Sequence, residues 1–201
     1  MVGDGHVGTK GYKLRSGDTG KQRYPRLSVG MCDQSVIETL ARAGEFSINT
    51  KILPSGKEFF IVDVVGIRAK RFLHLLHPHV GMNDRGYQME AILGKPTYLP
   101  PTLEWAAGLF AAEGSTYVYT NRQRSTPPKM GLCMQMNDPR AMKAFSEVMQ
   151  CPWRTTQSRS VVSLYGRDAE IVADKLLPHL KGTDKERQIL ATKSKLTEVV
   201  T

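Results

Sequence analysis

The sequence contains no long apolar run and nothing that resembles a signal peptide. Its best apolar stretch, Leu103 to Ala112, is too short to span a bilayer and includes Glu104. The first six residues have neither a basic segment nor an apolar core. We therefore expect a soluble, intracellular protein that does not bind membranes, in the cytoplasm of a bacterium or phage host or in an organelle.

Cysteine is scarce, and its pattern argues against two kinds of stabilising site. Cys32, Cys133 and Cys151 are odd in number and far apart, and no Cys-x-x-Cys pair occurs. A disulfide framework or a cysteine zinc site would need paired, closely spaced cysteines. We interpret the three thiols as small buried hydrophobes.

Acidic residues are outnumbered by basic ones. The 28 Lys and Arg side chains oppose 19 Asp and Glu side chains, which gives a formal charge of +9 and an isoelectric point near 9.6. Without a basic amphipathic helix, this balance favours nucleic acid over a membrane as the polyanionic partner. With 201 residues, of which 40% are hydrophobic, the chain can form one substantial domain or two small ones.

The chain repeats itself internally. The segment from Ile61 to Ala91 aligns without gaps to Val161 to Ala191, at a constant offset of 100 and with nine identities in 31 positions. Upstream, Pro25 to Met31 resembles Pro128 to Met134. The chain is therefore interpreted as a diverged duplication. The identical pairs are Val62/Val162, Gly66/Gly166, Ala69/Ala169, Leu76/Leu176, Pro78/Pro178, His79/His179, Asp84/Asp184, Gln88/Gln188 and Ala91/Ala191.

A short helix of small residues, which ends on Glu113, opens the second repeat. Ala107 with Ala111 and Gly108 with Ala112 fall four apart, so a second helix backbone could approach one face closely. We expect the opposite, bulky face to pack on a sheet. A carboxylate at a helix C-terminus is unfavourable unless a cation offsets it, which suggests a functional role for Glu113. The bulky residues are Leu103, Trp105 and Phe110.

The nine positions from Ala106 to Gly114 resemble the LAGLIDADG motif of homing endonucleases. The leading Leu of the motif is replaced by Ala106, and its first acidic residue is replaced by Ala111. The second acidic position, which supplies a metal ligand in the family, is kept as Glu113.

The first repeat retains only the end of such a motif, in Val2-Gly3-Asp4-Gly5-His6, with Asp4 opposite Glu113. Because only three residues precede Asp4, we expect the first motif helix to be largely missing, through truncation, a late start or its supply by a partner. Gly3, Gly5 and Gly8 also fit the G-x-G-x-x-G dinucleotide-binding pattern. No strand precedes them and no suitably placed acidic residue follows, so we reject that alternative.

The resemblance, together with the order of strand and helix patterns, implies an α+β fold. It consists of two pseudo-symmetric αββαββα repeats, each a curved antiparallel sheet with helices on one face. Residues 1–93 are predicted to form the first repeat, 94–101 a proline-rich linker and 102–201 the second repeat. The patterns predict a helix from Arg68 to His77 that ends before Pro78, and a strand from Thr116 to Arg124.

The resemblance also implies a chemistry. Asp4 and Glu113 would meet on the pseudo-twofold axis and hold two or three Mg²⁺ ions, with Mn²⁺ able to substitute and Ca²⁺ binding without cleavage. The implied reaction is hydrolysis of phosphodiester bonds in both strands of DNA. Counted back from Gln88 and Gln188, Arg85 and Lys185 occupy the place of the family's active-site lysine. Gln135 matches a glutamine that orders solvent, and its expected counterpart in the first repeat is Cys32.

DNA reading is assigned to the strands, since a β-ribbon fits the major groove and alternate side chains face the bases. The expected partner is a long, nearly non-palindromic duplex site, bound by a monomer and connected with intron or intein mobility. The candidate contact residues are Lys10, Lys13, Arg15, Lys21, Arg23 and Arg26 in the first repeat, and Arg122, Gln123, Arg124, Lys129, Arg154 and Arg159 in the second.

Other readings remain open beside the nuclease. Asp4 could be a solvated turn residue and Glu113 an incidental helix end. The chain could also be a DNA-binding regulator, an RNA-binding intron splicing cofactor (maturase) that has lost cleavage, or a degenerate fragment. A zinc site at His74, His77 and His79 is not favoured, because no carboxylate or cysteine completes the ligand set.

Overall fold

The computed structural model describes residues 5–12, 22–80, 84–94, 98–120 and 127–200. The chain divides into two compact units, Met1–Pro100 (unit one) and Pro101–Thr201 (unit two). Within the described ranges, no helix is long and apolar enough to cross a membrane.

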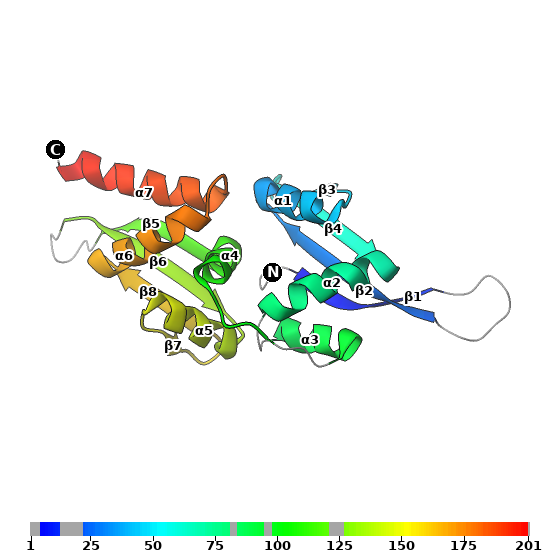
Figure 1. Ribbon diagram of the computed structural model, residues 1–201. Coiled ribbons are helices and arrows are strands. Elements are labelled where there is room, and N and C mark those ends of the chain that lie inside the picture. Colours follow the sequence, from blue (N-terminus) through cyan, green and yellow to red (C-terminus); the bar gives the residue numbers. More distant parts are fainter. Residues whose placement is uncertain (1–4, 13–21, 81–83, 95–97, 121–126, 201) are drawn as a thin grey trace. The chain divides into compact units, whose positions relative to one another are not determined.

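Unit one is a four-stranded antiparallel sheet, in the order β1-β2-β4-β3, with its helices on one side (Figure 1). Its elements are β1 (Gly5–Tyr12), β2 (Gln22–Met31), α1 (Gln34–Gly44), β3 (Asn49–Ile52), β4 (Glu58–Val65), α2 (Gly66–Val80) and α3 (Asp84–Leu93).

Unit two repeats this arrangement with one more helix at its start. Its strands follow the order β5-β6-β8-β7 and are again antiparallel. The elements are α4 (Leu103–Glu113), β5 (Gly114–Tyr119), β6 (Lys129–Met136), α5 (Pro139–Met149), β7 (Arg154–Thr155), β8 (Ser160–Tyr165), α6 (Arg167–Leu176), the 3₁₀ helix η1 (Leu177–His179) and α7 (Asp184–Val200). The predicted fold class, two α+β repeats with antiparallel sheets and helices on one face, is confirmed.

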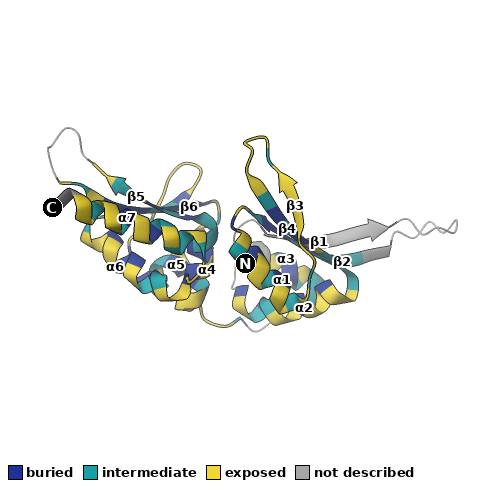
Figure 2. Ribbon diagram, turned by 90° about the horizontal axis from the view of Figure 1, so that it is seen from above, coloured by how far each residue is buried: buried dark blue, intermediate teal, exposed yellow. Residues whose placement is uncertain are grey.

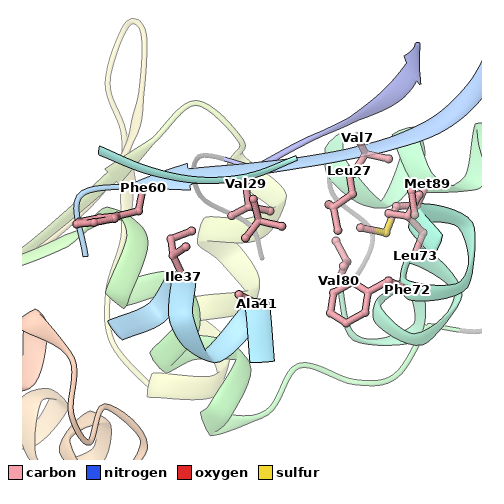
Figure 3. Packing of buried hydrophobic residues seen from close by; sticks show 12 residues of the cluster. Val7, Leu27, Val29, Ile37, Ala41, Phe60, Phe72, Leu73, Val80 and Met89 are labelled. Carbon is pink, nitrogen blue, oxygen red and sulfur yellow. The ribbon is translucent and has the colours of Figure 1, made fainter. Parts of the chain in front are cut away.

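The helices of unit one cover the sheet face that carries its apolar side chains. Leu27 and Val29 of β2 point from the sheet toward Ile37 of α1 and Leu73 of α2, and these four residues are almost fully buried (Figure 3). Alternation along β2 produces this face, because every second side chain of a strand points to the same side. Burial of such side chains is the main stabilising contribution to the unit.

Unit two buries the corresponding face of β6. Met130, Leu132 and Met134 are fully buried, together with Phe110 of α4 and Phe145 of α5. The intervening residues of β6 therefore lie on the other face, which none of the described helices of unit two covers (Figure 2). We call this other face the open face; its exposed residues include Tyr117, Tyr119, Lys129, Gln135, Arg154 and Tyr165.

Strand pairing aligns the two units residue by residue. Val62 and Val162, which match in the internal repeat, pair with Val29 and Met134 respectively. Val29 therefore corresponds to Met134, an offset of 105. The helix N-caps agree, since Asp33 caps α1 and Asp138 caps α5 through side chains that accept from the backbone two residues on.

This register corrects one sequence prediction. Cys32 is not the counterpart of Gln135. Gln135 pairs with Val161 in β8, and the equivalent pair in unit one joins Gly30 to Ile61. The sequence alignment of this strand was two residues out. Gly30 has no side-chain amide, so unit one lacks an equivalent of Gln135 at this position.

Two element boundaries also differ from the prediction. Helix α2 continues through Pro78 to Val80, whereas α6 ends at Leu176 and gives way to η1 around Pro178. Proline removes only one hydrogen bond in the last turn, and Val80 is buried, so packing retains the turn in α2. The strand expected over Thr116 to Arg124 runs from Gly114 to Tyr119, and residues 121–126 lie outside the described ranges.

The chain leaving unit one is held against the end of α2. The backbone N–H of Leu99 donates to the carbonyl oxygen of Pro78 at 2.7 Å. The rings of His77 and Tyr98 meet edge to face, with centroids 5.7 Å apart. Burial lowers the pKa of His77 from its usual value, and Nε2 of this side chain has no hydrogen-bond partner within the described residues.

Candidate functional site

Helix α4 passes into strand β5 without a loop, and Glu113 is its last residue. Thr102 caps the start of the helix by accepting a hydrogen bond from the Trp105 N–H at 3.2 Å. At the other end Gly114 has an extended backbone, and its N–H donates to the Phe110 carbonyl. A Cβ on Gly114 would lie 2.2 Å from the Phe110 ring, so this buried position requires glycine. The junction therefore fixes the backbone at Glu113.

The faces of α4 differ in part from the sequence prediction. Phe110 is fully buried, as expected, but Leu103 is 37% exposed. Of the small residues, Ala107 is buried, whereas Gly108 is exposed and a Cβ added to it would meet no described atom within 4 Å. The narrow face is thus centred on Gly108, and Leu103 is only partly covered.

Lys185 reaches the same junction from another element. It lies in the first turn of α7, a helix that packs along β5. Its Nζ donates a hydrogen bond to the carbonyl oxygen of Gly114, the residue that follows Glu113. The structure therefore brings a partly buried ammonium group to the peptide next to the candidate carboxylate, which is itself half-buried.

Gln135 approaches from the open face of the sheet. It follows Met134, and Met134 is the cross-strand partner of Gly114. The exposed Gln135 side chain therefore lies at the Gly114 end of β5. Val161 pairs with Gln135 on one side and with Arg154 on the other, which places Arg154 in the same row across the sheet. The segments that carry Glu113, Lys185 and Gln135 thus meet at one end of β5.

The equivalent end of unit one has the same backbone register. Gly5 pairs with Val29, and Gly114 pairs with Met134, the counterpart of Val29. Gly5 is therefore equivalent to Gly114, and the residue before it, Asp4, occupies the sequence position of Glu113. Asp4 itself lies outside the described residues. Arg85 is the second residue of α3, as Lys185 is the second residue of α7.

The carboxylate oxygens of Glu113 suit a hard cation such as Mg²⁺ that would also bind a phosphate of the substrate. Among the described residues no three His, Cys, Asp or Glu side chains form a group that could hold a metal by themselves. Mg²⁺ does not require such a cage, because it commonly binds through one or two carboxylates, waters and substrate phosphates. A single carboxylate at a fixed helix end fits that mode.

The predicted DNA contacts fall into three groups. Lys129, Arg154 and Arg159 are exposed in unit two. Lys10 and Arg23 belong to the paired strands β1 and β2. The others, Lys13, Arg15, Lys21, Arg122, Gln123 and Arg124, lie outside the described residues.

Arg26 differs from the exposed cations because its guanidinium group is hydrogen-bonded to the carboxylate of Asp63. Its Nε donates to Oδ1 of Asp63 at 2.7 Å, and its Nη2 donates to Oδ2 at 2.8 Å. This bidentate pair spans β2 and β4 and is only partly exposed. A carboxylate next to this predicted DNA-contacting arginine has no signal in the sequence, because Asp63 lies 37 residues away.

A group of tyrosines on the open face of unit two was also missed. The rings of Tyr119 and Tyr165 lie with centroids 4.7 Å apart. Burial, followed by the neighbouring Tyr165 hydroxyl, raises the pKa of Tyr117 to about 12. The alternation in Tyr117-Val118-Tyr119 was the available signal, since it puts two aromatic rings on one face of a strand.

Comparison of the sequence with protein-family models and with curated proteins finds no match. Solved structures do match. The LAGLIDADG homing endonuclease I-GzeII in complex with its DNA target is 12% identical, with a TM-score of 0.63 over 99% of this chain and 88% of that one. I-SmaMI bound to cleaved DNA is 12% identical, with a TM-score of 0.68 over 98% and 86%. I-SmaMI bound to uncleaved DNA in the presence of calcium gives 0.66 at 12% identity over 98% and 87%.

Proposed function

We propose that this chain, which has the fold of the LAGLIDADG homing endonucleases, is a sequence-specific endonuclease that cuts both strands of duplex DNA with the help of divalent cations. Solved proteins of this fold are bound to DNA targets, and one is bound to cleaved DNA. The formal charge of +9 is compatible with a polyanionic substrate.

The observation that carries the proposal is that the segments bearing Glu113, Lys185 and Gln135 meet at the Gly114 end of β5. A carboxylate, an ammonium group and an amide are the groups that hydrolysis of a phosphodiester needs, for a cation, for transition-state charge and for a water molecule respectively. They come from a helix end, a second helix and a strand, so the fold positions each of them separately.

In the proposed reaction, water adds to the phosphorus atom, and the bond from phosphorus to the leaving sugar oxygen breaks. One proton passes from the water to that oxygen. Glu113 and Asp4 each contribute one carboxylate toward Mg²⁺, which when bound lowers the pKa of water and stabilises the leaving oxygen. Gln135 orients the water, and Lys185, with Arg85 in unit one, offsets the negative charge that develops on the phosphate.

The test begins with a library of random duplexes, from which bound sequences are selected and then incubated with Mg²⁺. We expect paired cuts in the selected duplex that are absent in EDTA. Glu113→Gln and Asp4→Asn should each reduce the single-turnover cutting rate by about 10³-fold while binding persists, because each removes charge from a metal-binding carboxylate. Mn²⁺ should support cutting, and Ca²⁺ should support binding alone.

The matched control is Glu147→Gln, which removes one negative charge from an exposed position on α5. It should cut like the unaltered chain. Cutting that survives Glu113→Gln, or that continues in EDTA, would contradict the proposed site. Tight duplex binding without any cutting would instead indicate a DNA-binding regulator, and preference for a structured intron RNA would indicate a maturase.

A further inference from the structure

The three tyrosines on the open face of unit two form one continuous surface, which we call the tyrosine patch: Tyr117, Tyr119 and Tyr165. They are 38%, 36% and 46% exposed, so a large part of each side chain remains open to solvent despite the contacts between them. Large aromatic side chains exposed together on a sheet are uncommon unless they meet a partner. The patch therefore requires an explanation beyond the stability of the unit.

The patch rests on a fixed base. A Cβ added to Gly131 would lie 2.6 Å from the Tyr117 ring, so that ring packs directly on the backbone of the central strand β6. The rings of Tyr119 and Tyr165 also pack together, with centroids 4.7 Å apart. Rings ordered before binding lose little conformational entropy when they meet a partner.

One basic side chain lies beside the patch. Lys129 is the direct cross-strand partner of Tyr119 and is exposed on the same face. Gln135 and Arg154 lie on that face too, toward the Gly114 end of β5. Aromatic rings with a cation beside them are typical of a surface that binds nucleic acid, and they fit poorly with a purely apolar protein partner.

Unit one has a different surface at the equivalent positions. By strand register, Tyr117, Tyr119 and Tyr165 correspond to Gly8, Lys10 and Val65, and Gly131 corresponds to Arg26. Unit one thus carries the Arg26–Asp63 ion pair where unit two carries packed rings. The sheet face of unit one that carries Arg26 and Asp63 therefore differs in chemistry from the open face of unit two.

We propose that the tyrosine patch is a base-reading surface that contacts the C5-methyl groups of thymines in one half of the bound duplex. The thymine methyl is the apolar group that a B-form duplex displays in its major groove, and a two-stranded β-ribbon fits that groove. This inference rests on the proposed binding of duplex DNA. It adds the chemical group of the bases that unit two recognises.

Replacement of thymine by deoxyuracil tests this, because it deletes the methyl group and leaves base pairing intact. The selected duplex is made with single replacements at each thymine, and dissociation constants are measured at fixed salt. We expect one to three adjacent positions in a single half-site to weaken binding by about fourfold each, the value of one buried methyl-sized group. Replacements in the other half-site should have no comparable effect.

Variants then connect those positions to the patch. Tyr117→Ala and Tyr165→Ala should lose the sensitivity to deoxyuracil, whereas Tyr117→Phe should keep it because the ring remains. Gly131→Ala displaces the Tyr117 ring without changing its chemistry and should also reduce the sensitivity. Tyr87→Ala, which removes an exposed tyrosine of α3, is the matched control and should bind like the unaltered chain.

The possible failures are distinguishable. A chain that binds no duplex refutes the proposed function and this inference together. A chain that binds duplex, but shows no deoxyuracil-sensitive position or keeps its sensitivity in correctly folded Tyr117→Ala and Tyr165→Ala variants, refutes the inference alone. Circular dichroism of each variant verifies folding, and Tyr117→Phe and Gly131→Ala keep the test valid if an alanine variant unfolds.

Discussion

Lys185 donates a hydrogen bond from its Nζ to the carbonyl oxygen of Gly114, 71 residues away in sequence. This contact connects α7 to the junction between α4 and β5, where Glu113 lies. A lysine that served only as a solvated surface cation would have no need of a backbone partner in a half-buried site. The contact therefore points to a role for Lys185 beyond surface charge.

Replacing Lys185 by Met should slow DNA cutting by about 10²- to 10³-fold, the typical cost of losing one group that stabilises transition-state charge. Binding should weaken little, since one charge among many is removed. Single-turnover cutting rates and dissociation constants measured on the same duplex separate the two effects. Lys195→Met, an exposed change on the same helix, is the charge-matched control. Equal cutting by both variants would show that Lys185 is only a structural cation.

Asp63→Asn should strengthen binding to duplex DNA and make it more sensitive to salt. The change removes a negative charge from the sheet of unit one and releases Arg26 from its bidentate partner. One additional phosphate contact should steepen the plot of log affinity against log salt by about 0.9. Asp174→Asn, on helix α6, removes the same charge elsewhere and should leave the slope unchanged.

The same Asp63 variant should have little effect on stability. The Arg26–Asp63 pair is partly exposed, and such pairs contribute about 1 kcal/mol or less. Urea denaturation measures this directly. A large loss of stability, with no change in the salt dependence, would mean that the pair supports the sheet and does not concern DNA.

Gly114→Ala should lower the free energy of unfolding of unit two by about 1–3 kcal/mol, because the new methyl would overlap the Phe110 ring. Chemical denaturation followed by circular dichroism provides the measurement. A double-mutant cycle with Phe110→Leu supplies the control, since a smaller side chain leaves room for the methyl. The double variant should lose less than the sum of the two single losses. Simple additivity would rule out the steric explanation.

Stability should fall as the pH decreases through 6.5, because the pKa of His77 is lowered in the folded state by burial. Below pH 6.5 the unfolded chain takes up a proton that folded His77 resists, and the loss continues down to the lowered folded pKa. Glu90 opposes this shift, and His74 reinforces it.

The contribution of His77 is at most about 1.4 kcal/mol per pH unit, the value for one proton. Comparison of urea midpoints between pH 7.5 and 5.5 for the unaltered chain and His77→Gln isolates it. The slope should be smaller in the variant. His79→Gln, which changes an exposed histidine of the same helix, should retain the full slope.

Much of the fold could be predicted from the sequence, because two levels of pattern agreed. The repeat from Ile61 to Ala91 gave the order of elements twice, and turn residues such as Pro54 to Gly56 gave the hairpin that joins β3 to β4. The β2–β6 alignment failed because strands have a period of two. A slip of two residues keeps every apolar side chain on the buried face, so hydrophobicity alone cannot detect it.

The positions of the helix N-caps indicate the correct alignment of β2 with β6. Asp33 and Asp138 both precede helices and differ by 105 positions, whereas Pro25 and Pro128, which guided the alignment, differ by 103. A cap is tied to one backbone position, because its oxygen must reach a particular N–H. Similar prolines on a strand have no such constraint.

Long-range contacts were beyond the sequence pattern. Glu113 and Lys185 could be named individually, but the hydrogen bond from Lys185 to Gly114 depends on how α7 crosses β5. The tyrosine patch was missed because basic residues were weighed as the DNA-binding candidates and aromatic ones were not. Its cohesion comes from the pairing of β5 with β6 and of β6 with β8, which brings Tyr165 beside Tyr119.

The separate core of unit one has a consequence for synthesis on the ribosome. Its buried residues run from Val7 to Met89, and all of them precede the first residue of unit two. The described residues of this core have therefore been translated before α4 is made. Domains generally fold as units while translation continues. The nascent chain can thus bury its first set of apolar side chains early, which shortens the time during which they are available for aggregation.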